Sequence, residues 1–302
     1  MSITVKKQVP CFSFWYNENT IKIQAIKETG YRAINMKLTI ALAQISVDST
    51  DTESNLKKGA ARIAEAAERG AELICFPEMW TTGFNWNRLT SATYSHTEAM
   101  QRIAELAAEH RIWVSGSLAL RSAAGRVTNT ALLFSPEGKT ICTYDKIHLF
   151  SVAQEDKYLE PGSRPTLIDA PWGPTGFAIC YDLRFPELFR TYALQGTTLI
   201  ICPAAFPLQR LSHWQTLVQA RAIENQLFMV AVNQVGLQRF GALDPIPMGG
   251  SSMLVDPWGT QVAAAAPDDE QLVVTTIELD EAERIRKKIP VFRDRNPAAY
   301  NL

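Results

Sequence analysis

The sequence predicts an α/β fold in one domain. From residue 36 onward, short apolar stretches typical of strands alternate with longer amphipathic stretches typical of helices. Hairpin signals are mixed with this alternation. Because no repeat, low-complexity linker or charge block interrupts residues 36–302, the pattern indicates helices and sheets stacked as layers of a single domain.

Residues 1–35 do not share this pattern. Neither helical nor strand periodicity continues for long there, and the segment lacks the apolar core and cleavage site of a secretory signal. Met36 is followed at once by a strongly apolar first strand, residues 37–44. We therefore predict that residues 1–35 are an extension that is either poorly ordered or upstream of the true start.

Two helices are expected in the first half of the domain. Residues 52–69 carry apolar side chains along one helical face, and Gly70 suits a C-terminal stop. Residues 97–110 form the second amphipathic stretch, and Pro-Glu-Gly at 136–138 predicts a hairpin turn. The strands expected around them are residues 37–44, 73–76, 112–120, 129–134 and 140–145.

The second half repeats the alternation. The helices expected there are residues 186–195, 212–226 and a short helix that ends at Lys288. Asp280 and Glu283 have the spacing of a capping box at the start of that short helix. The strands expected are residues 176–179, 198–202, 227–233, 251–255 and 272–277.

Composition excludes several classes of protein. The 302 residues are 46% hydrophobic, which is enough to bury a substantial core. A formal net charge of −1 provides no basic field for a nucleic-acid partner. No stretch approaches the roughly 20 apolar residues that span a bilayer, so we expect no membrane partner.

The cysteines indicate a reducing compartment. Their number is odd and no CxxC pair occurs, which does not suit a disulfide framework. Cys75, Cys142 and Cys202 lie in strand-like apolar runs and are expected to be small core residues. We therefore predict a cytoplasmic location.

The stretch Gly176–Arg190 contains the most distinctive cysteine. Its sequence, GFAICYDLRFPELFR, begins with an apolar run that predicts a buried strand. Cys180 follows where this strand ends, and Pro186 with Glu187 suits the first turn of a helix. A thiol at such a junction is held by the sheet and faces its rim. Free cysteine is also among the most buried residue types, so Cys180 alone fits a core residue as well as a nucleophile.

Two further stretches change that balance. Residues 73–80, LICFPEMW, form an apolar strand that ends at the carboxylate of Glu78. Residues 144–150, YDKIHLF, place Lys146 in an apolar and aromatic setting. Each has a simpler interpretation, because Glu78 could cap a helix and Lys146 could form an exposed pair with Asp145 worth at most about 1 kcal/mol.

A glutamate, a lysine and a cysteine in this chain order, with the cysteine in a CYDLRFPE run, closely resemble the nitrilase superfamily of carbon–nitrogen hydrolases. The resemblance covers residues 36–300. It implies a four-layer α-β-β-α sandwich, in which two sheets pack face to face with helices outside. It also implies a homodimer that pairs through helices of the outer layer, with Tyr192 and Leu194 supplying some of the apolar surface.

The resemblance also implies a role for each residue. Amide hydrolysis requires a nucleophile, a proton carrier and an oxyanion stabiliser. Cys180 would attack as a thiolate, which the Lys146 ammonium favours, and Lys146 would also bind the oxyanion. Glu78 would carry the proton from the thiol to the departing ammonia and later activate water. The backbone N–H of Tyr181 would be the second oxyanion donor.

The family pattern includes a second glutamate between the lysine and the cysteine. Glu155 in QEDKYLEPG fits this place best, and Glu160 is the competing assignment. His148 permits a Cys–His pair instead, although the glutamate–lysine–cysteine order explains the site without an imidazole. His213, beside Trp214, resembles a His-Trp pair of the family that is structural or lies at the pocket rim.

No cofactor motif accompanies these residues. Gly-Lys-Thr at 138–140 lacks the earlier glycine of a phosphate loop, and no GxGxxG follows a strand. The sequence also contains neither HExxH nor a zinc-spaced cluster of His and Cys. We expect neither a metal nor an organic cofactor.

Several runs resemble the omega-amidase branch more than nitrilases proper. They are FPEMWTTGF at residues 76–84, HWQTL continuing into ARAIENQ within 213–226, and IPVFRDR at 289–295. Omega-amidases hydrolyse the terminal amide of short 2-oxo dicarboxylic monoamides such as 2-oxoglutaramate, so we expect a small-molecule amide substrate. Deaminated-glutathione amidases share the CYDLRFPEL run and the tail and are the alternative. Tyr181 stands where many nitrile hydrolysers have tryptophan, which disfavours a nitrilase.

The substrate pocket is less constrained by the sequence. The expected apolar walls are Trp80, Phe150 and Phe206. A keto-acid carboxylate needs a cationic or amide-rich partner, and the candidates are Arg184, Arg190 and Arg210. A hypothesis from a different class is an inactive relative that binds small amides or a partner protein; the four filled polar positions argue against it.

Overall fold

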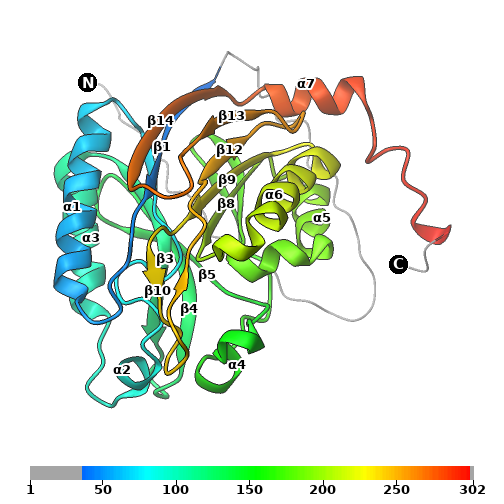
Figure 1. Cartoon of the computed structure of the whole chain (residues 1–302). Helices are drawn as coiled ribbons and strands as arrows, with labels where there is room; N and C mark the ends of the chain where they lie inside the picture. The colour runs from blue at the N-terminus through cyan, green and yellow to red at the C-terminus, as the bar shows by residue number, and fades with distance from the viewer. Residues whose placement is uncertain (1–35, 300–302) are drawn as a thin grey trace.

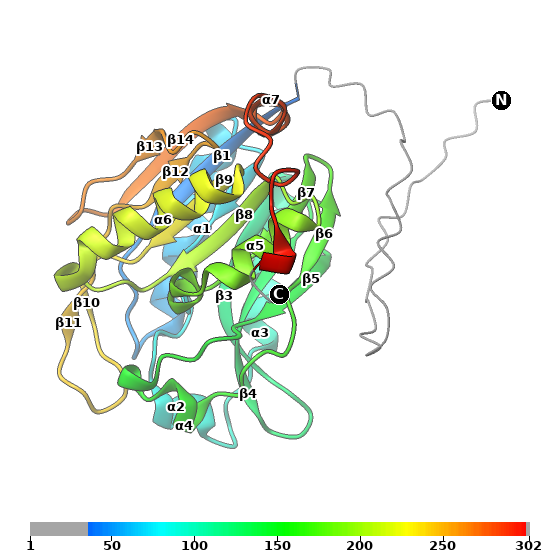
Figure 2. The same cartoon turned by 90° about the vertical axis from the view of Figure 1, so that its right-hand side faces the viewer.

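The structure is a computed structural model that describes residues 36–299. Within this range two six-stranded sheets lie face to face, and helices cover their outer faces (Figures 1 and 2). The predicted four-layer α-β-β-α arrangement is thereby confirmed. The extension predicted at residues 1–35 lies outside the described part of the chain, as do residues 300–302.

The first sheet has the strand order β14-β1-β2-β3-β4-β5. Its strands β1, β2 and β3 run parallel, and the remaining pairs are antiparallel. The strands are β1 Lys37–Gln44, β2 Leu73–Cys75, β3 Trp113–Arg121, β4 Val127–Phe134, β5 Thr140–Asp145 and β14 Gln271–Glu278.

The second sheet has the order β13-β12-β9-β8-β7-β6, again with a parallel centre, β7 to β9. Its strands are β6 Leu167–Ala170, β7 Gly173–Phe177, β8 Leu199–Ala204, β9 Phe228–Asn233, β12 Met253–Val255 and β13 Gln261–Ala264. A separate two-stranded pair consists of β10 Leu237–Gln238 and β11 Ile246–Pro247.

The helices form the two outer layers. Figure 1 shows α1 and α3 against the first sheet and α5 and α6 against the second. The helices are α1 Thr52–Glu68, α2 Trp86–Thr90, α3 Thr97–His110, α4 Glu155–Tyr158, α5 Pro186–Leu194, α6 Leu211–Asn225 and α7 Glu281–Lys288. The 3₁₀ turns are η1 Ser151–Ala153, η2 Cys180–Arg184, η3 Leu208–Arg210 and η4 Pro297–Ala299.

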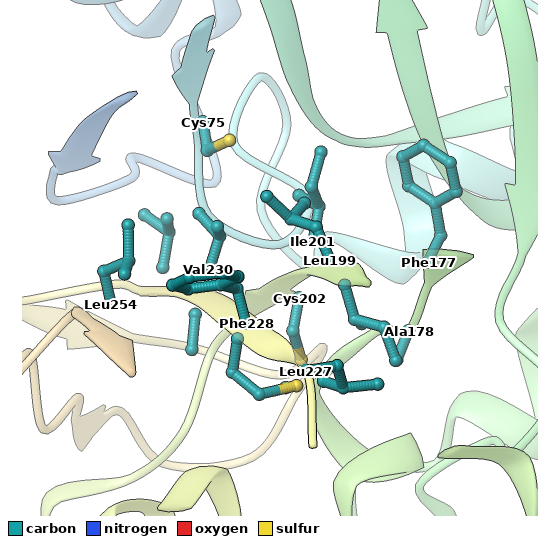
Figure 3. Close-up of a cluster of buried hydrophobic side chains, with 14 of the residues drawn as sticks. Cys75, Phe177, Ala178, Leu199, Ile201, Cys202, Leu227, Phe228, Val230 and Leu254 are labelled. Atoms are coloured by element: carbon teal, nitrogen blue, oxygen red, sulfur yellow. The ribbon is translucent and has the colours of Figure 1, made fainter. Parts of the chain in front are cut away.

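The sheets are apolar on both faces. Because side chains alternate along a strand, β1 directs Ile40 into the core between the sheets and Ala41 into the core beneath α1 and α3. Figure 3 shows Cys75 of the first sheet opposite Ile201 and Val230 of the second. Burial of both faces explains why these strands are continuous apolar runs in the sequence.

Several local expectations differ from the structure, and strands β10, β11 and β13 and helices α2 and α4 were not predicted. The four-residue strand β6 was not expected, because it is too short to show a period. Strand β7 begins earlier than expected and ends at Phe177. The capping box at Asp280 is wrong: this residue has helical backbone angles and caps no N–H, and its Oδ2 lies 3.3 Å from Arg284 of the same helix. An ion pair one turn along α7 has replaced the cap.

Candidate active site

The candidate site lies where strands of both sheets end. Glu78 follows β2, Lys146 follows β5 and Cys180 follows β7. All three line one pocket of about 380 Å³, together with Glu155 of α4 and Ala205 after β8. Strand ends hold the backbone rigidly while leaving side chains at the rim, which is where α/β proteins commonly bind ligands.

Lys146 is the centre of a buried charged cluster. Its Nζ donates to Glu78 Oε1 at 2.7 Å and to Glu155 Oε1 at 2.8 Å. All three side chains are at most 2% exposed. Burial alone would lower the pKa of Lys146, but the two carboxylates outweigh it and raise this pKa above its usual range. One permanent ammonium therefore serves two carboxylates.

The two carboxylate oxygens of Glu78 have different partners. Besides the Lys146 ammonium, Oε1 accepts a hydrogen bond from Asn129 Nδ2 at 2.8 Å. Oε2 accepts from the backbone N–H of Ala205 at 2.9 Å. The Glu78 carbonyl accepts from Gln234 Nε2 at 2.6 Å. Because main chain and side chain are both held, the carboxylate has the fixed orientation that a general base requires.

Glu155, and not Glu160, lies beside Lys146. The second oxygen of Glu155 accepts from the backbone N–H of Phe150 at 2.8 Å. Burial raises the pKa of Glu155 to about 7, although the Lys146 ammonium opposes this shift. Glu160 instead lies 3.1 Å from Arg126 with a side chain that is 45% exposed.

Cys180 is presented by a tight turn with an unusual backbone. Its φ is +44°, a left-handed value that is uncommon for any residue except glycine. The buried carboxylate of Asp182 holds this turn: Oδ2 accepts from Ile179 N–H and the Tyr144 hydroxyl, both at 2.8 Å. Its Oδ1 accepts from His148 N–H at 3.0 Å. Backbone strain maintained in this way is typical of functional residues.

The surroundings of Cys180 favour its neutral thiol form. Burial and the Glu78 carboxylate raise its pKa well above the usual range, and the opposing effects of Lys146 and the Ala205 N–H are smaller. The expectation that Lys146 favours the thiolate is therefore right in direction but outweighed in the free protein. A neutral thiol needs a base to become a nucleophile. Glu78 is the carboxylate that has the largest effect on the pKa of Cys180.

The geometry does not favour a Cys–His pair. His148 Nδ1 lies 2.7 Å from Asp182 Oδ1, and its ring stacks on Phe185 at 3.6 Å. The imidazole does not line the pocket that contains Cys180. His213 is exposed on α6.

Aromatic side chains and two arginines form the rest of the pocket lining. The aromatic residues are Phe150, Tyr181, Phe206 and Phe240. Arg184 lies over the Phe206 ring at 5.3 Å, and Arg210 lies over the Phe150 ring at 5.8 Å. Within residues 36–299, neither guanidinium is part of a salt bridge. Arg190, the third candidate, lies over Phe292 outside the pocket.

The structure does not support Trp80 as a pocket wall. Its ring stacks on Phe76 at 4.4 Å in the core beneath α1 and α3, on the far side of the first sheet from the second. The chain turns at Met79, whose φ is +49°, so Glu78 and Trp80 point in different directions. This change of direction has no signal in the sequence.

Sequence reasoning missed three groups that contact the charged cluster or the turn. Asn129 and Asp182 are fully buried polar residues, but each has polar neighbours in the sequence (VTNTA and CYDLR), so no local pattern marks them as buried. Ala205 contributes through its backbone N–H, which any residue type except proline would supply. The position of this N–H is set by where β8 ends, and the identity of the residue gives no indication of it.

The described residues contain neither a cluster of metal ligands nor a helix that could span a membrane. Within residues 36–299, no three or more His, Cys, Asp and Glu side chains are grouped to hold a metal ion. None of the helices described there has the length and apolar character to cross a membrane.

An α-β-β-α sandwich with glutamate, lysine and cysteine at one pocket defines a class of hydrolase. The model of the family described as carbon-nitrogen hydrolase matches residues 39–287. The chain belongs to this family and hydrolyses amide C–N bonds.

Characterised relatives match almost their full length. The chain is 35% identical to the 2-oxoglutaramate amidase of Bacillus subtilis, covering 86% of this chain and 98% of that protein. It is 32% identical to the human omega-amidase NIT2, covering 86% of this chain and 96% of that protein. These names support an amidase of the carbon–nitrogen hydrolase superfamily.

Solved structures agree with this assignment. Saccharomyces cerevisiae Nit3, a member of the nitrilase superfamily, is 28% identical with a TM-score of 0.75, covering 84% of this chain and 94% of that one. The Caenorhabditis elegans NitFhit protein is 33% identical with a TM-score of 0.79, covering 87% of this chain and 66% of that one.

Proposed function

We propose that the protein is a cysteine-dependent amidase that hydrolyses the terminal amide of short 2-oxo dicarboxylic acid monoamides, such as 2-oxoglutaramate and 2-oxosuccinamate. The observation that carries this proposal is the pocket itself. It combines Cys180 beside a buried glutamate–lysine cluster with two arginines that form no salt bridge within the described part of the chain. Relatives named 2-oxoglutaramate amidase and omega-amidase support the same substrate class.

The chemistry proceeds in two halves. Glu78 takes the proton of the Cys180 thiol while the sulfur attacks the amide carbon, and the oxyanion is bound by Lys146 and the backbone N–H of Tyr181. The tetrahedral intermediate collapses to a thioester as the C–N bond breaks, and Glu78 returns the proton to the departing ammonia. Glu78 then removes a proton from water, which attacks the thioester and releases the acid. Glu155 keeps Lys146 in place throughout.

The arginines supply what a keto acid requires at its other end. A guanidinium can donate two parallel hydrogen bonds to a carboxylate. Arg184 and Arg210 line the pocket with Cys180 and have no competing carboxylate in residues 36–299. Binding the distant carboxylate allows the enzyme to use that energy to place the amide against Cys180.

The pocket size favours a short substrate. Its open volume of about 380 Å³ includes solvent at the mouth, so the enclosed space around Cys180 is smaller still. A five-carbon keto-acid amide suits this space better than the peptide-like chain of deaminated glutathione. A reducing cytoplasm, expected from the cysteine pattern, suits a thiol nucleophile.

A substrate panel tests this proposal. We expect kcat/KM for 2-oxoglutaramate to exceed that for deaminated glutathione, aliphatic nitriles and N-carbamoyl compounds. A matched amide that lacks the carboxylate should be a poor substrate, because the arginines would lose their partner. Intact-protein mass spectrometry should show an acyl adduct on the wild type and none on C180A.

Three results would contradict parts of the proposal. Deaminated glutathione as the best substrate would favour the alternative amidase class and a longer pocket. Amidase activity in C180A would show that Cys180 is not the nucleophile. Binding of amides without ammonia release would favour an inactive relative that binds small amides.

A further inference from the structure

Asn129 contacts Glu78 directly, and only one of its two polar side-chain atoms is hydrogen-bonded among the described residues. It lies in β4 and is completely buried. Its Nδ2 donates to Glu78 Oε1 at 2.8 Å, but its Oδ1 is buried and has no hydrogen-bond partner among the residues that the structure describes. An unsatisfied buried carbonyl destabilises the folded state, so this orientation needs a compensating reason. The reverse orientation would point Oδ1 at the carboxylate and is excluded by repulsion.

The consequence for Glu78 is an asymmetry between its two oxygens. Among residues 36–299, Oε1 accepts from both Lys146 and Asn129, whereas Oε2 accepts from the Ala205 N–H alone. The Ala205 N–H also acts to lower the pKa of the Cys180 thiol, and Ala205 and Cys180 line the same pocket. Oε2 is therefore bound by a backbone donor that also influences the sulfur, and it keeps more free acceptor capacity than Oε1.

We propose that Asn129 is a positioning residue that, together with Lys146, keeps Glu78 Oε1 as a pure acceptor and thereby directs the catalytic proton to Oε2. This inference rests on the proposed roles of Glu78 and Cys180. In the proton step the S–H bond of Cys180 breaks as the O–H bond forms on Oε2. The sulfur electron pair forms the bond to the amide carbon. The same proton leaves Oε2 for the departing amine.

Other charged groups around this pair define what a titration would report. Lys146 and Glu155 face Glu78 from the segment after β5 and from α4, and Cys180 faces it from η2. Asp145, the last residue of β5, precedes Lys146 in the chain and accepts a hydrogen bond from the Thr130 hydroxyl at 2.6 Å. A new carboxyl at position 129 would thus share its nearest cation, Lys146, with two existing carboxylates.

The decisive pair of variants is N129D and N129L. At low pH, a protonated carboxyl at position 129 can donate to Glu78 Oε1 as the amide does. As pH rises, that proton is lost and two adjacent carboxylates repel. We expect N129D to approach wild-type kcat at low pH and to lose activity as pH rises through the range where the wild type is active. N129L should lose kcat by about 10–100-fold at every pH, with KM nearly unchanged.

Asn225 provides a matched control. It too is fully buried with an unpartnered Oδ1, and its Nδ2 donates to the Arg221 carbonyl at 3.1 Å and to Glu224 at 3.3 Å. It lies on α6 and does not line the pocket. N225D and N225L should lower the thermal midpoint while keeping the wild-type pH profile of kcat, because the lost hydrogen bonds lie outside the pocket.

The outcomes separate this inference from the proposed function. If C180A or E78Q remains active, the proposed function fails. If both are inactive while the N129D pH profile superimposes on the wild type, the inference about Asn129 alone is overturned. Should N129L fail to fold, the N129D profile still decides. A pH-dependent loss in N129D that is absent from N225D supports the proposal.

Discussion

At the scale of single residues, the pocket is organised by an imbalance of charge. Lys146 is one ammonium between two buried carboxylates, Glu78 and Glu155. Buried ions are tolerated only when they are paired and hydrogen-bonded. Here the single cation neutralises one carboxylate, and the effect of desolvation on the second appears in the raised pKa of Glu155.

This imbalance predicts how stability changes with pH. The pKa of Glu155 is about 7 in the folded protein, against 4.5 for an unperturbed glutamate side chain. Between these pH values the folded protein retains a proton that the unfolded chain has lost, so the free energy of unfolding falls as pH rises. The slope is up to about 1.4 kcal/mol per pH unit. Denaturant titrations at several pH values should show this decline in the wild type and not in E155Q.

A second glutamate serves as the control for that experiment. Glu160 is largely solvent-exposed beside Arg126, so E160Q should keep the wild-type dependence on pH. Equal slopes in the wild type and E155Q would mean that Glu155 does not titrate in this window.

The sequence identified the polar residues of the pocket but not how they are held. Glu78, Lys146 and Cys180 stand in apolar contexts where charged or reactive groups are unusual, and the structure brings all three into one pocket. Asn129 and the Ala205 N–H escaped because their importance depends on a partner more than 50 residues away in the chain. Residue type alone carries no such information.

At the scale of elements, the turn that carries Cys180 is the most constrained piece of backbone. The Asp182 carboxylate accepts hydrogen bonds from the Tyr144 hydroxyl and from the backbone N–H groups of His148 and Ile179. The His148 ring nitrogen Nδ1 also lies 2.7 Å from it. Arg221 of α6 adds donors from Nε and Nη2 to the Leu183 carbonyl at 3.0 and 2.7 Å. These contacts keep Cys180 at a positive φ that costs a residue with a Cβ roughly 1–2 kcal/mol.

This strain predicts an unusual effect of glycine. C180G relieves the clash of the Cβ with its own backbone, whereas C180A retains it. We expect C180G to be more stable than C180A by about 1 kcal/mol, measured by denaturant unfolding. In A178G, a neighbouring buried position without positive φ, glycine should destabilise instead. If C180G is the less stable of the pair, the turn is not strained.

The predicted helices and strands agree best with the structure where the hydrophobic pattern extends over many residues. The helix predicted at residues 97–110 has the same bounds in α3, and the first strand coincides with β1. Period 3.6 and continuous apolar runs both reflect burial, so they survive without tertiary information. The four-residue strand β6 and the capping interaction in α7 depend on neighbours in space, which the local sequence does not specify.

At the scale of the whole molecule, the site belongs to neither sheet alone. Glu78 and Lys146 follow strands of the first sheet, while Cys180 and Ala205 follow strands of the second. The apolar core between the sheets, seen in Figure 3, therefore sets the distance between base and nucleophile. Core substitutions that shift one sheet against the other should affect activity before they unfold the protein.

The outer layer on the second sheet carries the remaining prediction, a homodimer. Two apolar side chains are half exposed there, Leu194 at 48% on α5 and Ile223 at 52% on α6. Tyr192, which we expected to join them, is instead completely buried, with its hydroxyl donating to the Phe177 carbonyl at 2.6 Å. The family resemblance implies that such outer helices pair.

Light scattering at micromolar protein tests this pairing. We expect the wild type to have the mass of two chains, because exposed apolar side chains on adjacent helices gain most by covering one another. I223E should shift the mass to one chain, since a carboxylate at the centre of the contact would be desolvated without a partner. Leu237 is the control: it is 69% exposed and belongs to β10, outside α5 and α6, and L237E should leave the mass unchanged. A wild-type mass of one chain, or equal effects of I223E and L237E, would rule out the α5–α6 face as the interface.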